Sequence, residues 1–190
     1  MNYLAHFHLA QSEPALVAGA LLGDYVKGPL KGVLPANVER GIVLHRKIDA
    51  FTDEYALTQQ LHTLFPSKYR RCSGIMLDLY FDHLLARDWH DYEQEPLTQF
   101  SSRVQANLDD YEQLLPAAAK GFKQRLQQYD LLSRYAQPTT IDRTLQHIAG
   151  KLRAPNPLAS AMQHLIARDE ELTAVFKVFY PALQRFSSAQ

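Results

Sequence analysis

The chain has 190 residues, of which 46% are hydrophobic, and its 20 basic side chains balance 20 acidic ones. A chain of this length usually forms one domain, and its apolar fraction excludes wholesale disorder. The balanced charge argues against general binding to nucleic acid, and no apolar run reaches the roughly 20 residues that cross a membrane. The N-terminus shows no secretion signal, and a single cysteine, Cys72, excludes an internal disulfide. We therefore expect one cytoplasmic domain over residues 1–190, with no nucleic-acid or membrane partner.

Apolar residues recur at helical spacing, and alternating β-branched runs are absent, which predicts an all-α helical bundle. Asn2 and Ser12 are expected to cap the first two helices, and Gly28–Pro35 is expected to form a loop. Prolines at 66, 116, 138, 155 and 157 mark breaks between helices. The helices expected in chain order are 2–10, 13–27, 36–53, 54–65, 67–90, 96–115, 117–136, 139–152 and 157–185.

Acid and imidazole side chains recur within otherwise apolar segments of the first ninety residues. They are His6, His8, Asp24, His45, Asp49, Asp53, Asp78, Asp82 and His83. Carboxylates are rarely buried unless they are paired or bound to a metal, so their recurrence suggests one shared polar site. Oxygen and imidazole ligands without thiolates suit a divalent cation such as Mn²⁺ or Mg²⁺, and Fe²⁺ or Zn²⁺ also accept them. The pattern favours a metal-dependent hydrolase.

His45 and Asp49 are four residues apart, which places them about 40° apart on one helical face. Ile48 and Phe51 flank this polar row, so we expect it to be half buried. The alternative is an exposed His–Asp pair without function. Asp53 continues the same face, or caps the helix that follows.

Asp78 and Asp82 repeat the four-residue spacing, and His83 lies about 100° from Asp82 on the helix. Two acids in a strongly apolar helix are expensive without a counter-charge. We interpret Asp82 and His83 as functional, and Asp78 as a ligand or as a residue that orients one. Structural salt bridges to Arg70, Arg71 or Arg87 are the alternative.

His6 and His8 point about 200° apart on a helix, so only one of them can serve the site. We favour His6 and interpret His8 as a core residue. Asp24 follows Gly19 and Gly23, whose spacing lets another helix backbone approach closely, so Asp24 is expected at a tightly packed junction. The alternative for Asp24 is a residue at the end of its helix.

These motifs resemble the acyl-carrier-protein phosphodiesterase family. The similar stretches are Met1–Ala10, Leu22–Gly28, Gly41–Asp49 with Thr52 and Asp53, and Leu77–Leu84, and the total length agrees. The resemblance implies hydrolysis of the phosphodiester that joins 4′-phosphopantetheine to a serine of acyl carrier protein. It also implies an all-helical fold related to the HD phosphohydrolases, and a divalent cation, typically Mn²⁺. The HD doublet is His-Asp, whereas Asp82-His83 has the reverse order, so ligands are not transferred from HD enzymes.

Under this resemblance a metal would activate water and support the leaving serine oxygen. Its ligands would be Asp24, His45 and Asp82, together with His6 or Asp78. Asp49 or His83 would move the proton, and Arg46 would contact a phosphate oxygen unless it is an exposed solubilising charge.

The densest basic cluster is Lys68, Arg70 and Arg71. Because carrier proteins are acidic, these residues are expected to steer the acyl carrier protein, unless they are an ordinary solvated charge run. Two rival functions stay open at this point. One is an HD-type nucleotide phosphohydrolase, and the other is a non-catalytic helical binding protein whose acids form structural salt bridges.

Overall fold

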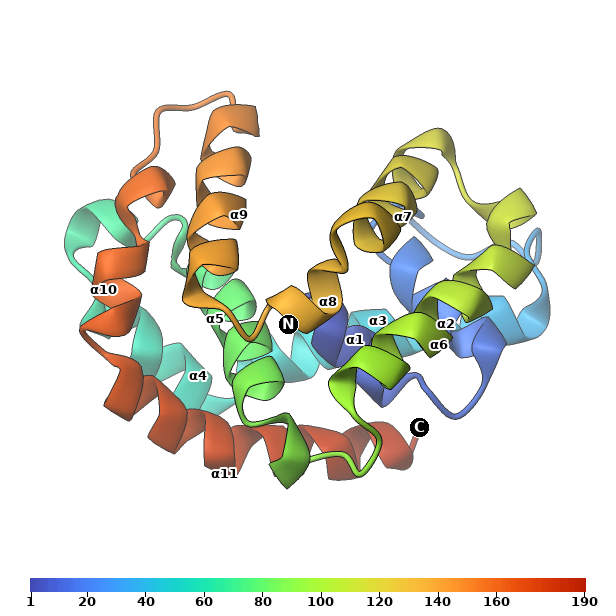
Figure 1. The fold of residues 1–190 in the computed structure, drawn as a ribbon, viewed down its shortest axis with the longest axis horizontal. Coiled ribbons are helices and arrows are strands. Elements are labelled where there is room, and N and C mark those ends of the chain that lie inside the picture. The colour runs from blue at the N-terminus through green and yellow to red at the C-terminus, as the bar shows by residue number, and fades with distance from the viewer.

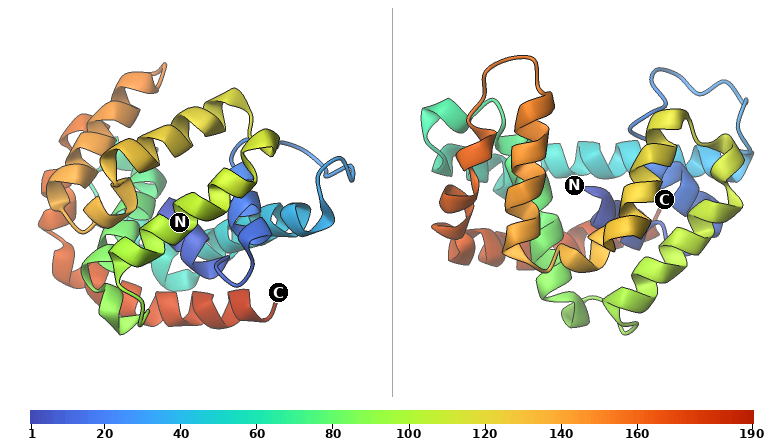
Figure 2. Two further views of the ribbon diagram at one scale, coloured as in Figure 1. Left: turned by 45° about the vertical axis from the view of Figure 1, so that its right-hand side comes forward. Right: turned by 45° about the horizontal axis from the view of Figure 1, so that its top comes forward.

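A computed structural model describes residues 1–190 and contains eleven α-helices, five short 3₁₀ helices and no strand, which confirms the all-α prediction (Figure 1). The α-helices are α1 (Tyr3–Leu9), α2 (Pro14–Leu22), α3 (Ala36–Glu54), α4 (Ala56–Leu61), α5 (Ser73–Arg87), α6 (Leu97–Asp110), α7 (Ala117–Tyr129), α8 (Leu131–Arg134), α9 (Pro138–Lys151), α10 (Met162–Ile166) and α11 (Asp169–Ser188). The 3₁₀ helices are η1 (His62–Leu64), η2 (Ser67–Tyr69), η3 (Trp89–Asp91), η4 (Glu112–Leu114) and η5 (Leu158–Ser160). In Figures 1 and 2, α11 runs along one side of the molecule, and α7 and α9 form two arms on either side of the N-terminus.

One hydrophobic cluster of 48 buried residues joins the helices. Aromatic side chains fill its centre where α5 meets α11, with the ring of Phe81 5.3 Å from Phe176 and 5.5 Å from Phe179. No helix combines the length and the apolar character that crossing a membrane requires.

Several of the expected helices are shorter than predicted or are divided, including those expected over 13–27, 67–90, 117–136 and 157–185. Residues 67–72 form η2 and a turn, so α5 begins at Ser73, and the hydroxyl of Tyr69 contacts that of Ser160 at 2.8 Å. The last expected helix divides into η5, α10 and α11. The break between α10 and α11 is explained by three acids in the first turn of α11, where the helix dipole favours negative charge. They are Asp169, Glu170 and Glu171.

The predicted caps at Asn2 and Ser12 do not form. Asn2 occupies the N-cap position of α1, but its side chain makes no capping hydrogen bond and donates instead to the hydroxyl of Tyr135 at 3.2 Å. The residue at the N-cap of α2 is Glu13 rather than Ser12. The predicted loop from Gly28 to Pro35 is present between α2 and α3.

The backbones of α2 and α3 touch at two glycines. A Cβ atom built on Gly41 would lie 2.6 Å from the carbonyl oxygen of Leu16 and 2.8 Å from the Cα atom of Gly19. A Cβ on Gly19 would in turn lie 2.6 Å from the Cα atom of Gly41. Only residues without a side chain allow this approach, which fits the close helix contact expected from the small-residue spacing.

We predict that Gly41→Ala lowers the free energy of unfolding by about 2 to 3 kcal/mol, because the added methyl group meets backbone atoms that cannot move separately from their helix. Urea unfolding followed by circular dichroism measures the change. Gly121→Ala in α7 is the matched control, since its Cβ would meet only the guanidinium of Arg125, at an ordinary 3.8 Å. Equal stability of the two variants would contradict the tight α2–α3 contact.

Candidate metal centre

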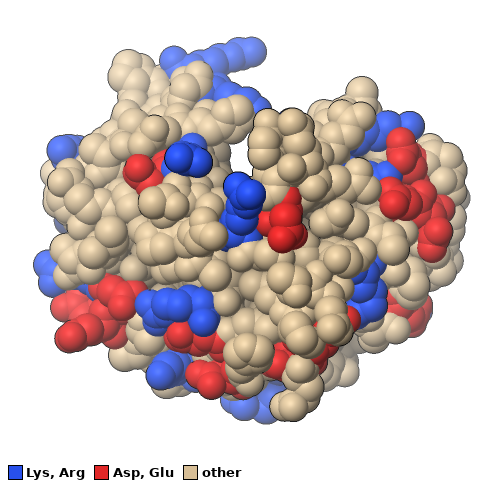
Figure 3. Space-filling model, viewed as in Figure 1, with Lys and Arg blue, Asp and Glu red and all other residues tan.

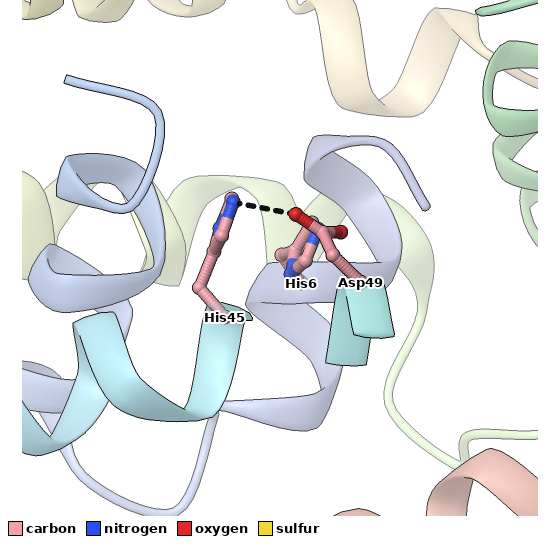
Figure 4. A group of neighbouring side chains, drawn as sticks. All are labelled: His6, His45 and Asp49. Carbon is pink, nitrogen blue, oxygen red and sulfur yellow. Dashed lines mark ion pairs between the residues drawn. The ribbon is translucent and has the colours of Figure 1, made fainter. Parts of the chain in front are cut away.

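Three side chains from α1 and α3 converge on one point beside the N-terminus. They are His6, His45 and Asp49, and potential ligand atoms of the three lie within 4.8 Å of one another (Figure 4). The Nε2 atom of His6 lies 3.0 Å from Oδ1 of Asp49, and Nε2 of His45 lies 3.2 Å from Oδ2. The two imidazole rings are stacked with their centroids 3.9 Å apart. The imidazoles are buried, whereas the carboxylate is 43% exposed, so the group opens to solvent on the side of Asp49.

The tautomer of His45 is fixed by the backbone. Its Nδ1–H donates to the carbonyl of Ala20 at 2.8 Å, because a carbonyl can only accept. In the neutral ring the lone pair then lies on Nε2, which faces the carboxylates of Asp49 at 3.2 Å and Asp24 at 3.7 Å. Acceptors that face one another in this way require a proton or a cation between them. The imidazole nitrogen and the carboxylate oxygens are therefore suitable ligands for a divalent cation.

His6 holds the carboxylate of Asp49. Its Nε2 faces only acceptors, namely this carboxylate and the carbonyl of Met1 at 3.2 Å, so Nε2 carries the proton in this arrangement. Its Nδ1 is buried and has no hydrogen-bond partner. Burial lowers the pKa of His6 to about 4, so the ring is neutral at pH 7. His6 thus orients Asp49, and it could bind a metal through Nε2 only after releasing that proton.

Asp49 is ionised in the folded protein. Burial tends to raise the pKa of its carboxyl, but its contacts with the imidazoles of His45 and His6 outweigh burial and hold the pKa well below its usual range. The negative charge that a cation requires is therefore present at neutral pH.

Further acids lie around this group. A cavity of about 470 Å³ is lined by Asp24, Asp49, Asp53 and Asp78, together with His45 and apolar side chains. The carboxylate of Asp78 lies 2.9 Å from the α-amino group of Met1, which is 3.6 Å from Asp49. No sequence motif indicates that this amino group belongs to the site. Asp53 does not cap the following helix, because the N-cap of α4 is Tyr55.

Arg46 lies beside the group and is tied to the backbone. One guanidinium nitrogen donates to the carbonyl of Val26 at 2.8 Å. Its side chain lines a smaller cavity of about 330 Å³ with Asp24, His45 and Asp49. Arg46, which the sequence predicts to contact a phosphate oxygen, therefore lies in the same region as the candidate ligands.

The structure does not bring Asp82 into this group. Its carboxylate is fully buried and accepts hydrogen bonds from the backbone N–H groups of Leu4 at 2.7 Å and Ala5 at 3.1 Å. Burial raises the pKa of Asp82 to about 7, although these two hydrogen bonds act in the opposite direction. Both oxygens are engaged, so Asp82 caps α1 from a distant helix and thereby fixes the helix that carries His6.

His83 also lies outside the group, because its Nδ1–H donates to the carbonyl of Tyr135 at 2.8 Å. Burial lowers the pKa of His83, so it is a neutral residue of the interior rather than a proton donor at the centre. His8 is likewise buried, and its Nδ1 contacts the hydroxyl of Tyr180 at 2.7 Å.

The predicted steering residues Lys68, Arg70 and Arg71 lie at η2 and the turn after it. All three are exposed, and the ammonium of Lys68 lies over the ring of Tyr69 at 5.1 Å. None of them lines the cavities beside the candidate centre.

A family model described as "Acyl carrier protein phosphodiesterase" matches residues 1–183. The chain belongs to the acyl carrier protein phosphodiesterase family. A protein of that name from Yersinia pestis is 33% identical over 186 residues, which cover 97% of this chain and 96% of the relative. Another, from Klebsiella pneumoniae strain 342, is 30% identical over 188 residues, covering 98% and 97%. No solved structure matches this chain, so the relation of this phosphodiesterase family member to the HD phosphohydrolases stays a prediction.

We predict that Asp82→Ala lowers the free energy of unfolding by about 2 to 4 kcal/mol, because it leaves two buried N–H groups of α1 without acceptors. Urea unfolding in buffer without added metal measures this loss. Asp78→Ala is the matched variant, since that carboxylate is 40% exposed, and we expect it to change stability by about 1 kcal/mol or less. A wild-type stability for Asp82→Ala would show that the cap is unimportant.

Proposed function

We propose that this protein hydrolyses the phosphodiester between 4′-phosphopantetheine and a serine of holo acyl carrier protein. The products would be apo carrier protein and free 4′-phosphopantetheine. We also propose that the reaction needs a divalent cation, with Mn²⁺ as the first choice and Mg²⁺ or Fe²⁺ as alternatives. The names of the relatives support the substrate and the bond. The single observation that supports the metal is the lone pair of His45, which faces the carboxylates of Asp49 and Asp24.

In this proposal His45, Asp49 and Asp24 hold the metal. A divalent cation held there would neutralise the charge of a phosphodiester, activate a water molecule and support the leaving serine oxygen. Asp49 is the carboxylate nearest to both imidazoles, so we assign it to the metal rather than to proton transfer. Asp78 lines the same cavity and is 40% exposed, and we assign the proton transfer to its carboxylate.

The remaining residues prepare the site. His6 donates to Asp49 and fixes the direction of its carboxylate. Arg46 uses one nitrogen to bind the carbonyl of Val26, and its other donors make no hydrogen bond. Because the same side chain lines the cavity with Asp24, those donors can bind a phosphate oxygen.

The test is to incubate holo acyl carrier protein with this protein and Mn²⁺, with and without EDTA, and to measure the mass of the carrier by mass spectrometry. We expect the carrier to lose the phosphopantetheine mass in the presence of Mn²⁺ and to keep it in EDTA. Asp49→Asn should slow the reaction about a hundredfold or more, since it removes a charged ligand. Glu54→Gln, which neutralises an exposed acid near the end of the same helix, is the matched control and should be as active as the unmodified protein.

An unchanged carrier mass with Mn²⁺, Mg²⁺ and Fe²⁺ would contradict the proposal. Hydrolysis of a nucleotide phosphoester under the same conditions would then favour the nucleotide phosphohydrolase alternative.

A further inference from the structure

A second cleft, of about 600 Å³, opens between α7, α8 and α9. Its lining includes Asn2, Leu79 and Ile148, and these three residues also line the cavity that contains His45 and Asp49. The two hollows are therefore neighbours, and the cleft lies beside the candidate metal centre. Figure 1 shows the N-terminus between the two arms that carry α7 and α9.

The lining of this cleft is basic. Arg125 on α7, Arg134 on α8, and Arg143 and Lys151 on α9 all contribute to it, and no aspartate or glutamate does. In Figure 3 the same face is hollowed between the two arms, with basic side chains along one arm and below the hollow, where one acidic group lies nearby. Four cations from three helices thus surround one opening.

These cations have no acidic or hydrogen-bonding partner within the protein. All four are exposed, and none of their charged groups makes an ion pair or a hydrogen bond. Some arginines elsewhere are compensated, for example Arg87 by Asp169 at 2.9 Å and Arg103 by Glu95 at 2.6 Å. Uncompensated charges of one sign around a cleft attract an anionic partner and raise its rate of association.

The cleft also presents aromatic surface. Tyr3, Phe122 and Tyr129 line it, and Tyr129 is 48% exposed. The guanidinium of Arg125 lies over the ring of Phe122 at 5.7 Å. Arginine together with tyrosine and phenylalanine is the composition that distinguishes the buried centre of protein–protein interfaces. A protein surface with acidic side chains therefore fits this cleft better than a small anion does.

We propose that this cleft docks the acidic surface of the carrier protein around its modified serine, an inference that rests on the proposed function. In this arrangement the phosphodiester reaches the carboxylate and imidazole group past Asn2 and Leu79. The proposal moves the docking surface from Lys68, Arg70 and Arg71, which lie outside the cleft, to the cations of α7, α8 and α9.

The test compares steady-state kinetics on holo acyl carrier protein between charge-neutralised variants. Arg125→Gln combined with Arg143→Gln should raise KM about tenfold, with kcat within about twofold, and added salt should reduce the difference from the unmodified protein. The matched control is Lys177→Gln with Arg185→Gln, which removes two exposed, unpaired cations from α11 and should leave KM unchanged. A third variant neutralises Lys68, Arg70 and Arg71, and it should also leave KM unchanged.

An unchanged KM in the cleft variant, with an active unmodified protein, would overturn the docking proposal and leave the proposed function standing. A rise confined to the variant of Lys68, Arg70 and Arg71 would overturn it as well and would place docking at η2. If the unmodified protein shows no turnover, the proposed function fails, and docking is judged by titration with fluorescently labelled apo carrier protein. Equal affinity of the cleft variant, or tighter binding of a single-stranded oligonucleotide than of the carrier, would then overturn the proposal.

Discussion

The contact between the backbones of α2 and α3 determines where the candidate ligands lie. Gly19 and Gly41 let the two helices approach without side chains between them. One turn later, Gly23 leaves the space that the imidazole of His45 fills, and the carbonyl of Ala20 accepts a hydrogen bond from its Nδ1–H. A helix pair held further apart would lose this hydrogen bond and would separate His45 from Asp24. Packing thus fixes both the position and the tautomer of the imidazole.

The buried carboxylate of Asp82 supplies the second constraint. It accepts hydrogen bonds from the first turn of α1 and so anchors this short helix on α5. α1 in turn carries His6 against Asp49. A carboxylate without access to solvent therefore contributes to the site by placing another residue. The exposed cations of the neighbouring cleft differ from Asp82, because they make no ion pair or hydrogen bond within the protein.

Much of this architecture could be predicted from the sequence, because its signals are local. Prolines and helical periodicity gave most of the helices, and the four-residue spacing placed His45 and Asp49 on one face. The sequence could not distinguish a metal from two backbone N–H groups as the partner of Asp82, since either compensates a buried charge. Nor could it find the basic cleft, because Arg125, Arg134 and Arg143 lie on three consecutive helices whose angles to one another, which create the cleft, are not visible in the sequence. The run at Lys68–Arg71 is the densest basic cluster in the sequence, and density in the chain is the only signal of a basic surface that a sequence offers.

The most direct test of a metal centre at His45 and Asp49 is anomalous X-ray diffraction from crystals soaked in Mn²⁺. We expect an anomalous peak within coordination distance of Nε2 of His45 and of the carboxylate of Asp49, with Asp24 beside it. A peak at Asp82 and His83, or no peak near His45 in crystals saturated with Mn²⁺, would contradict the assignment.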